Sequence, residues 1–423
     1  MSTSIRNEIN NDGRLLDFIA KINKHAWVGG DHPPFNMDIV DMESSTNFRL
    51  APELHQKYDA VWLYEKRLDR YHVLSWRIAV DEAIRLLGEN GFLVIRLFQT
   101  REITVPMVKS FLGRNINIEI DIELEYTNGR NDSIMIFKIK RLNIDKYKDN
   151  LWTFAMLTNG QKDENVVKFL ESIRNRNPEN KHEIIISGPQ KKIYDKYNVK
   201  YLDVSQFRDE QYAEISKKKN AIAKIASNPN LLIAHDRYYL SDAFFSDFEK
   251  YGYDFDFLAV KQLFEDGREF PSYMFLYEPG LTWTHPVICK DYKYLFKGQY
   301  VNGGLMVFKT HNLKAVPFND LLFWNQMEDG EISRLFTNNS LIPRVNFISA
   351  VCVIDDKSEK LHTFAYWDVF DGKTIIQGPR AVRSKVYGID YVFGPRKLSL
   401  KIKFKPKFPF ISIIAGKKPR GNI

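Results

Sequence analysis

Residues 228–240, NPNLLIAHDRYYL, decide the fold of the second half of the chain. Four apolar residues, 231–234, are followed at once by His235, Asp236 and Arg237. An apolar run that ends in charge is typical of a buried strand opening into a loop, and ligands of α/β sheets bind where strands end. A carboxylate there can bind a divalent cation, which can in turn bind a diphosphate. A charged surface turn is the alternative.

Composition narrows the class of protein. The 423 residues are 44% hydrophobic and 27% charged, which is typical of a soluble protein with two or three domains of roughly 100 to 200 residues each. No apolar run reaches the roughly 20 residues that span a bilayer, and residues 1–13 lack the apolar core of a signal peptide, so we expect a cytoplasmic protein. The two cysteines, Cys289 and Cys352, are too few for a disulfide framework or a structural zinc site.

The formal charge of +8, from 61 basic and 53 acidic side chains, suits an anionic partner. Its distribution is more informative than its size. Outside the last thirty residues there is no basic block with interleaved aromatic residues, so we expect no nucleic-acid partner.

Residues 1–142 are predicted to form one α/β unit. Strand-like and amphipathic helical runs alternate along it, and it ends in two consecutive strand-like runs. Residues 88–91 are expected to turn the chain into a buried strand. Residues 143–150, NIDKYKDN, are polar without periodicity and are predicted to be a linker. The expected strands are 35–42, 58–63, 92–98, 116–126 and 133–141, and the expected helices are 14–24, 74–87 and 105–113.

The run from YDAVWL (58–63) to AIRLLGENGFLVIRL (83–97) resembles the later half of a class I, SAM-dependent methyltransferase domain. The resemblance covers about half of that fold and departs from it where the cofactor binds. No GxGxG-type turn precedes FNMDIVDM, and Gly29-Gly30 leads into prolines instead of a helix, so a cofactor would lack its main anchor. We therefore expect a degenerate, non-methylating domain without SAM. If a nucleoside still bound, the residues facing its ribose would be Asp38 and Asp41.

Residues 151–395 are predicted to form a second α/β unit. The order strand, helix, strand, strand, helix, strand is that of a doubly wound nucleotide-binding sheet with parallel strands. The expected strands are 151–157, 182–189, 199–204 and 231–234, and the expected helices begin near 163 and 215.

This unit resembles a glycosyltransferase of the GT-A fold, close in layout to the large family 2 group. The opening strand ends in Thr158, a Lys219-Asn220 pair precedes the central strand, and His235 to Arg237 stand where the family has a DxD-type motif. The resemblance implies a nucleotide-diphosphate sugar as donor and a saccharide or lipid-linked saccharide as acceptor. The residues expected to contact the donor are Thr158, Asn159, Asp203, Lys219, Asn220, Asp236 and Arg237.

The departure from DxD bears on the metal, because one carboxylate is missing. Asp236 is then the main expected ligand of Mn²⁺ or Mg²⁺, and His235 either assists or shapes the turn. The resemblance implies a late nitrogen ligand at His362, although a lone histidine is more often structural. Alternatively, Arg237 neutralises the diphosphate directly without an ion.

Residues 300–308, YVNGGLMVF, and 323–336, FWNQMEDGEISRLF, resemble GT-A segments that bind the sugar and deprotonate the acceptor. By position in the motif, Asp329 is expected to be the base and Glu328 to bind acceptor hydroxyls, since adjacent carboxylates raise each other's pKa. Acidic residues are also favoured at a helix N-terminus for structural reasons. Glycines let a sugar approach the backbone, a tight turn being the alternative. The expected acceptor-binding residues are Trp283, Asn302, Gly303, Gly304 and Trp324.

Residues 396–423 interleave lysines with apolar side chains. This pattern suits an anionic membrane surface, and lysines guarding an edge strand are the alternative. We therefore expect an inverting hexosyl- or deoxyhexosyltransferase of glycan or polysaccharide synthesis, either free in the cytoplasm or peripheral at the inner face of the membrane. A working methyltransferase fused to a transferase, and a non-enzymatic glycan-binding or scaffold protein, remain as rivals.

Overall fold

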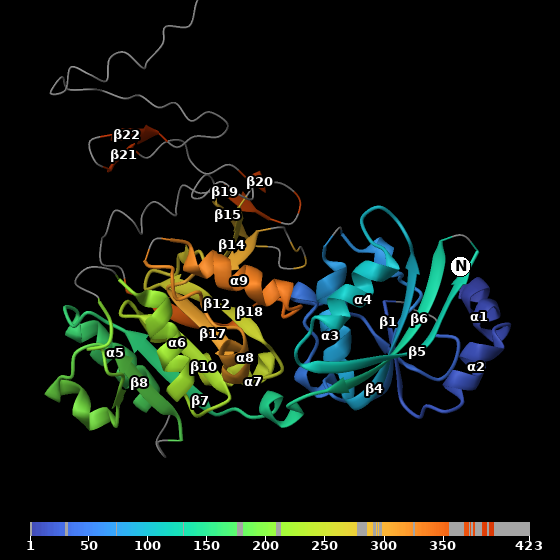
Figure 1. Ribbon diagram of the computed structural model, residues 1–423, viewed down its shortest axis with the longest axis horizontal. Coiled ribbons are helices and arrows are strands. Elements are labelled where there is room, and N and C mark those ends of the chain that lie inside the picture. The colour runs from blue at the N-terminus through green and yellow to red at the C-terminus, as the bar shows by residue number, and fades with distance from the viewer. Residues whose placement is uncertain are drawn as a thin grey trace, which may run out of the picture.

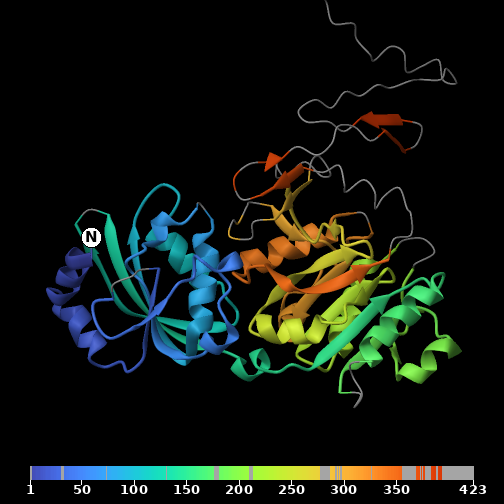
Figure 2. The ribbon, with the colours of Figure 1, turned by 180° about the vertical axis from the view of Figure 1, so that it is seen from behind.

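Two α/β units lie side by side in the protein (Figures 1 and 2). The sequence-based expectations for Trp283, His362 and the tail 396–423 fall outside the described residues. The structure, a computed structural model, describes residues 2–29, 33–72, 74–129, 131–175, 181–208, 213–276, 286–290, 293, 295, 298–324, 326–354, 368–371, 373, 375–376, 383–386 and 389–392.

A six-stranded sheet forms the centre of the N-terminal unit, in the order β2-β1-β3-β4-β6-β5. The first four strands in that order are parallel, whereas β6 runs antiparallel to β4 and β5 antiparallel to β6. The strands are β1 (His25–Val28), β2 (Asp38–Val40), β3 (Tyr58–Leu63), β4 (Leu87–Phe98), β5 (Ile118–Asn128) and β6 (Asp132–Arg141). The α-helices are α1 (Ser2–Asn10), α2 (Gly13–Ile19), α3 (Trp76–Leu86) and α4 (Val105–Gly113).

The expected turn at residues 88–91 is wrong, because this segment is part of β4. Asn90 and Gly91 are in register with Lys140 and Ile139 of β6. Gly91 lies against β3, where a Cβ would stand only 3.0 Å from the carbonyl oxygen of Asp59. The glycine therefore permits a close approach between neighbouring strands instead of a change of chain direction.

Helix α3 is buried on nearly all sides because it lies between the two units. Apolar residues such as Trp76 and Ile84 pack in the core of the N-terminal unit. Asp81, Glu82 and Arg85 are also buried, although charged side chains are rarely buried unless they are paired. Each of the three has at least one partner in the second unit.

The second unit is built on a nine-stranded sheet in the order β11-β18-β12-β17-β10-β7-β8-β9, with β13 beside β12. Strands β10, β7, β8 and β9 are parallel, as the alternation predicts, whereas β17 is antiparallel to β10. The strands are β7 (Trp152–Leu157), β8 (Glu183–Ser187), β9 (Lys200–Tyr201), β10 (Asn230–His235), β11 (Tyr238–Leu240), β12 (Phe257–Phe264), β13 (Glu269–Phe270), β17 (Leu305–Lys309) and β18 (Arg344–Val353).

Helices cover both faces of this sheet, and each face has its own apolar core. α5 (Asp163–Arg174) and α7 (Phe244–Tyr251) contribute to one core. α6 (Ile215–Ile225), α8 (Thr310–Ala315) and α9 (Glu328–Asn338) contribute to the other. No helix among the described residues combines the length and apolarity that crossing a bilayer requires.

A five-stranded sheet, in the order β16-β14-β15-β19-β20, stands at the α9 end of the second unit (Figure 2). Strands β21 and β22 pair with each other. The bounds are β14 (Tyr273–Leu276), β15 (Pro286–Cys289), β16 (Gln299–Val301), β19 (Asp368–Phe370), β20 (Ile375–Ile376), β21 (Arg383–Val386) and β22 (Ile389–Val392). The 3₁₀ turns are η1 (Thr46–Phe48), η2 (Pro52–Leu54), η3 (Leu68–Arg70), η4 (Ile144–Tyr147) and η5 (Lys192–Tyr197).

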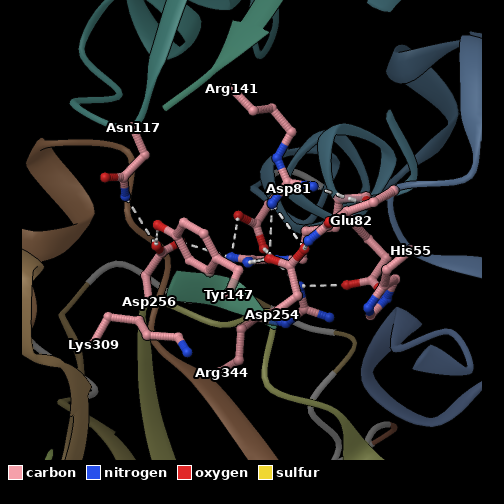
Figure 3. A network of polar contacts seen from close by, with 12 residues as sticks. His55, Asp81, Glu82, Asn117, Arg141, Tyr147, Asp254, Asp256, Lys309 and Arg344 are labelled. Carbon is pink, nitrogen blue, oxygen red and sulfur yellow. Dashed lines mark hydrogen bonds and ion pairs between the residues drawn. The ribbon is translucent and has the colours of Figure 1, made fainter. Parts of the chain in front are cut away.

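A buried network of ion pairs joins the two units (Figure 3). Arg85 of α3 contacts Asp254 and Asp256 of the second unit, each at 2.6 Å. In the opposite direction, Arg344 of β18 contacts Asp81 of α3 at 2.8 Å. The network contains four carboxylates and four guanidinium groups, so its charges balance: Asp81, Glu82, Asp254, Asp256, Arg49, Arg85, Arg141 and Arg344.

The segment expected to be a linker, residues 143–150, takes part in this interface. It contains η4, whose Tyr147 is buried and donates a hydrogen bond from its hydroxyl to Asp256 at 2.8 Å. Tyr147 thus anchors a segment whose polar side chains are mostly exposed.

Candidate active site

Asp236 lies directly after β10, the strand that runs parallel to β7 on one side and antiparallel to β17 on the other. Its carboxylate Oδ2 accepts a hydrogen bond from the Thr158 hydroxyl, at the end of β7, over 2.8 Å. Its backbone carbonyl accepts a hydrogen bond from Asn165 of α5 over 2.9 Å. Both contacts draw Asp236 towards the parallel half of the sheet.

The turn Asn302-Gly303-Gly304 stands beside this point, because Gly304 O accepts a hydrogen bond from the N–H of His235 over 2.9 Å. We expected its glycines to leave room for a sugar. Instead, protein side chains lie where their Cβ atoms would be: at Gly303, a Cβ would stand 2.9 Å from both Asp329 Cβ and Glu328 Oε1. The side chain of Asn302 is also engaged within the protein, with Gly304 N and Pro271 O.

Asp329, in the first turn of α9, is held by the same turn. Its Oδ2 accepts a hydrogen bond from Gly303 N over 3.0 Å, and its Oδ1 accepts one from Gly330 N over 2.8 Å. Burial, together with the neighbouring charge of Glu328, raises the pKa of Asp329 to about 6. The Gly303-Gly304 turn thus brings Asp329 and Asp236 to the same end of the sheet.

Glu328 is buried beside Asp329 and pairs with Lys219 of α6. The Lys219 ammonium is fully buried, 3.3 Å from Glu328 Oε1 and 3.0 Å from Gly303 O. We expected Lys219 to contact a donor, but burial confines its ammonium to these protein partners. Lys219 therefore fixes the position of α9 relative to the glycine turn.

Asn220 is likewise used within the protein. Its amide nitrogen donates to Phe318 O and Asp320 Oδ1, and its oxygen accepts from Phe318 N, over 2.7 to 2.9 Å. These bonds tie the segment before α9 to α6. In that segment, Trp324 is half exposed.

Two other expected donor residues, Asn159 and Asp203, sit in exposed turns. Asn159 Oδ1 accepts from Gln161 N over 3.0 Å, and Asp203 Oδ1 accepts from the N–H and hydroxyl of Ser205. Both side chains support their own loops. Of the seven residues expected to contact the donor, Thr158 and Asp236 are joined by a direct contact.

His235 is neutral, because burial and the nearby charges of Lys219 and Arg237 hold the pKa of its imidazole well below its usual range. A divalent cation needs several oxygen or nitrogen ligands at one point. Within the described ranges, no three His, Cys, Asp or Glu side chains lie close enough together to hold a metal ion. The expected Mn²⁺ or Mg²⁺ ion at Asp236 would therefore need further ligands from the diphosphate or from water, and the metal site stays a prediction.

No family model matches the chain, and no curated protein matches it. Among solved structures it is similar to the glycosyltransferase TarS of S. aureus (15% identity, TM-score 0.33, covering 48% of this chain and 36% of that chain). It is also similar to GalNAc-T7 with UDP, GalNAc and Mn²⁺ (13%, 0.36, 48% and 44%). A third is the mannosyltransferase PcManGT from Pyrobaculum calidifontis with GDP-Man and Mn²⁺ (10%, 0.34, 51% and 59%).

These structural neighbours are glycosyltransferases, and each is matched over less than two thirds of its own length. TM-scores below 0.5 are too low to carry a functional conclusion.

Sequence reasoning missed several residues that shape the site. Asn165 gives no local signal, because it stands among ordinary polar residues of α5. Gln262 does give one, since it is a single amide in the apolar run of β12 and is buried. A buried polar side chain requires hydrogen-bond partners and therefore indicates a polar site within the core.

Proposed function

We propose that the chain is a glycosyltransferase that moves a sugar from a nucleotide diphosphate to a hydroxyl of a saccharide or lipid-linked saccharide. The observation that supports this proposal is that the Gly303-Gly304 turn contacts both Asp329 and His235, the residue before Asp236. Nucleotides bind at the carboxyl ends of parallel strands, where Thr158 and Asp236 lie. A carboxylate of raised pKa close to that edge is a suitable general base.

In the proposed reaction, Asp329 takes the proton of the acceptor hydroxyl. The hydroxyl oxygen bonds to the anomeric carbon as the bond to the diphosphate oxygen breaks, and the electron pair leaves with the nucleoside diphosphate. Attack opposite the leaving group inverts the anomeric configuration. With a pKa of about 6, Asp329 is ionised at neutral pH yet more basic than an ordinary aspartate.

Glu328 supports the base in this proposal. Its Oε1 is engaged by buried Lys219, so the pair holds the first turn of α9 against Gly303. This differs from the expected contact between Glu328 and acceptor hydroxyls. The remaining acidic group, Asp329, is half-buried and is the better candidate for proton transfer.

On the donor side we propose that Thr158 and Asp236 bind hydroxyl groups of the nucleotide sugar. One oxygen of Asp236 already accepts from Thr158, and a carboxylate has further lone pairs for a ribose or sugar hydroxyl. An unscreened carboxylate repels a diphosphate, so we propose that the diphosphate lies away from Asp236 unless a divalent cation is bound between them.

The test is a thermal-shift screen of the full chain with UDP, GDP and dTDP sugars, each with and without Mn²⁺. We expect at least one nucleotide to raise the unfolding temperature of the wild type and of Asp329→Asn alike, because Asp329 lies on the acceptor side. Transfer should be lost in Asp329→Asn, and NMR of the wild-type product should show inversion. If no nucleotide binds, the proposal fails and a non-enzymatic glycan-binding role is favoured.

We propose that the N-terminal unit is a degenerate methyltransferase-like support without a SAM reaction. Trp27, Trp62 and Tyr64 pack their rings about 6 Å apart on one face of the sheet, at the strands that precede Gly29 and Glu65. These bulky rings fill the interior beside the strands with side chains, which suits a supporting role. Calorimetric titration with SAM tests the alternative, because measurable binding would restore the fused-methyltransferase interpretation.

A further inference from the structure

We propose that Arg237 binds an anionic group, a phosphate or a carboxylate, carried by the acceptor. This inference rests on the proposed transferase function and names the class of acceptor. It also revises the expectation that Arg237 faces the diphosphate of the donor.

The direction of Arg237 separates it from the donor side. Its Nη2 packs against Gly304, where a Cβ would stand only 2.5 Å away, and its guanidinium lies 5.5 Å from the ring centre of Phe270 on β13. Asp236, one residue earlier, turns the other way to contact Thr158 of β7. Arg237 therefore reaches towards β13, away from the strand ends proposed to bind the nucleotide.

Arg237 also differs from the arginines buried between the two units. Arg85, Arg141 and Arg344 each contact at least one carboxylate at 2.6 to 2.8 Å. Arg237 forms no ion pair with any residue that the structure describes, and its Nε is buried without a hydrogen-bond partner there. A partly buried guanidinium without a counter-charge is costly, so the site favours an anion from outside the chain.

Two further side-chain nitrogens near Gly304 are also buried without a hydrogen-bond partner among the described residues. They are the Nε2 atoms of Gln262 and His235. Gln262 belongs to this group because its Oε1 accepts from the Tyr238 hydroxyl, which itself lies 2.7 Å from the Cβ position at Gly304. Guanidinium and amide N–H groups donate, and an imidazole nitrogen can donate as well. Such a set matches the oxygens of a phosphate or carboxylate.

The glycine turn places this anion site next to the proposed base. Arg237 packs on Gly304 and Asp329 packs on Gly303, and consecutive Cα atoms are about 3.8 Å apart. One acceptor molecule can therefore place an anionic group on Arg237 and a hydroxyl on Asp329. A sugar phosphate or a uronic acid carries both groups on one ring.

The test uses isothermal calorimetry on the full chain, with inorganic phosphate, glucuronate and neutral methyl glucoside as probes. Each probe is titrated with and without a saturating concentration of UDP, or of whichever nucleotide raises the unfolding temperature. Arg237→Gln is compared with Arg268→Gln, an exposed arginine paired with Asp266. We expect at least one anionic probe to bind the wild type and Arg268→Gln with nucleotide present, and Arg237→Gln to bind it about tenfold more weakly or worse.

The two anionic probes distinguish a phosphate from a carboxylate. Competition between anion and nucleotide would overturn the inference, because it would assign Arg237 to the donor diphosphate. Unchanged anion affinity in Arg237→Gln, or no binding of either anion to the wild type, would also overturn it. Arg237→Lys provides a second variant, expected to bind with intermediate affinity because it keeps the charge but loses the planar fork. If no nucleotide binds, the transferase proposal fails while the anion titrations still report on Arg237.

Discussion

The N–H of Gly303 donates to Asp329 Oδ2 over 3.0 Å, so a carboxylate on α9 is positioned by the turn that precedes β17. The same turn contacts His235 through Gly304 O and Lys219 through Gly303 O. Lys219 and His235 therefore share contacts to one turn with Asp329, which lies about a hundred positions later in the sequence. Small changes in this turn should affect both sides of the proposed reaction.

Replacing the proposed base should abolish transfer. Asp329→Asn keeps the size of the side chain but cannot accept the proton, so we expect kcat to fall about 10²- to 10⁴-fold. Glu331→Gln, in the same helical turn, is the matched control and should retain activity. Initial rates at saturating donor measure both variants, and a fall in Glu331→Gln equal to that in Asp329→Asn would count against the assignment.

The acidic limb of the pH–rate profile should move in opposite directions in two variants. Asp329 must be ionised to act, so activity should rise with pH around a midpoint near 6. Glu328→Gln removes a neighbouring negative charge that raises the pKa of Asp329, so the limb should move to lower pH. Lys219→Met removes a positive charge that lowers this pKa, so the limb should move to higher pH. Shifts in the same direction would contradict the assignment.

Adding one methyl group to the turn should damage the site more than the fold. In Gly303→Ala the new Cβ would come within 2.9 Å of Asp329 Cβ, so the first turn of α9 must shift. We expect kcat to fall roughly a hundredfold and stability to fall by about 1 to 3 kcal/mol. Gly113→Ala is the control, since no neighbouring atom lies within 4 Å of its Cβ position. Circular dichroism melts and initial rates decide the outcome.

Removing the central arginine of the interface should destabilise both units together. Arg85→Met leaves Asp254 and Asp256 with fewer counter-charges in a buried setting, at an expected cost of about 3 to 5 kcal/mol. Arg14→Met removes an exposed pair with Asp12 and should change stability far less, because water screens surface ion pairs. Urea unfolding should show one transition, shifted to lower urea in Arg85→Met. Two separate transitions in the wild type would contradict the coupling of the units.

Lys309 should make stability depend on alkaline pH. It is fully buried between Lys146 O and Asn230 Oδ1, and burial lowers its pKa to about 7. Between pH 7 and about 10.4 the unfolded chain binds this proton and the folded chain does not, so this group makes stability rise with pH. The unfolding free energy of the wild type, relative to Lys309→Met, should therefore increase from pH 7 to pH 9.5. A constant difference would refute the shift.

The elements of the second unit were the most predictable part of the fold. Apolar runs such as 151–157 and 231–234 are buried on both faces in the parallel strands β7 and β10, so composition alone identifies them. The roles of Lys219 and Asn220 were not predictable. Their partners, Glu328 and Phe318, lie about a hundred residues away and are brought close by the fold.

The interface between the units was also hidden from sequence reasoning. Asp81, Glu82 and Arg85 lie within a helix whose other residues, apart from Arg77, are apolar. In an isolated helix such a pattern suggests a partly solvated face. The relevant carboxylates, Asp254 and Asp256, follow α7 about 170 positions later. Local periodicity reports which residues are apolar, but it does not identify which buried charges neutralise one another.

The balanced network between the units bears on how this protein can be engineered or can diverge. A chimera that replaces the N-terminal unit with a related one would remove Asp81, Glu82 and Arg85. Their partners Asp254, Asp256 and Arg344 would remain in the second unit. Each of these charges would then be buried without its counter-charge. We therefore expect a chimera to fold when the charged residues on both sides of the interface are transferred together.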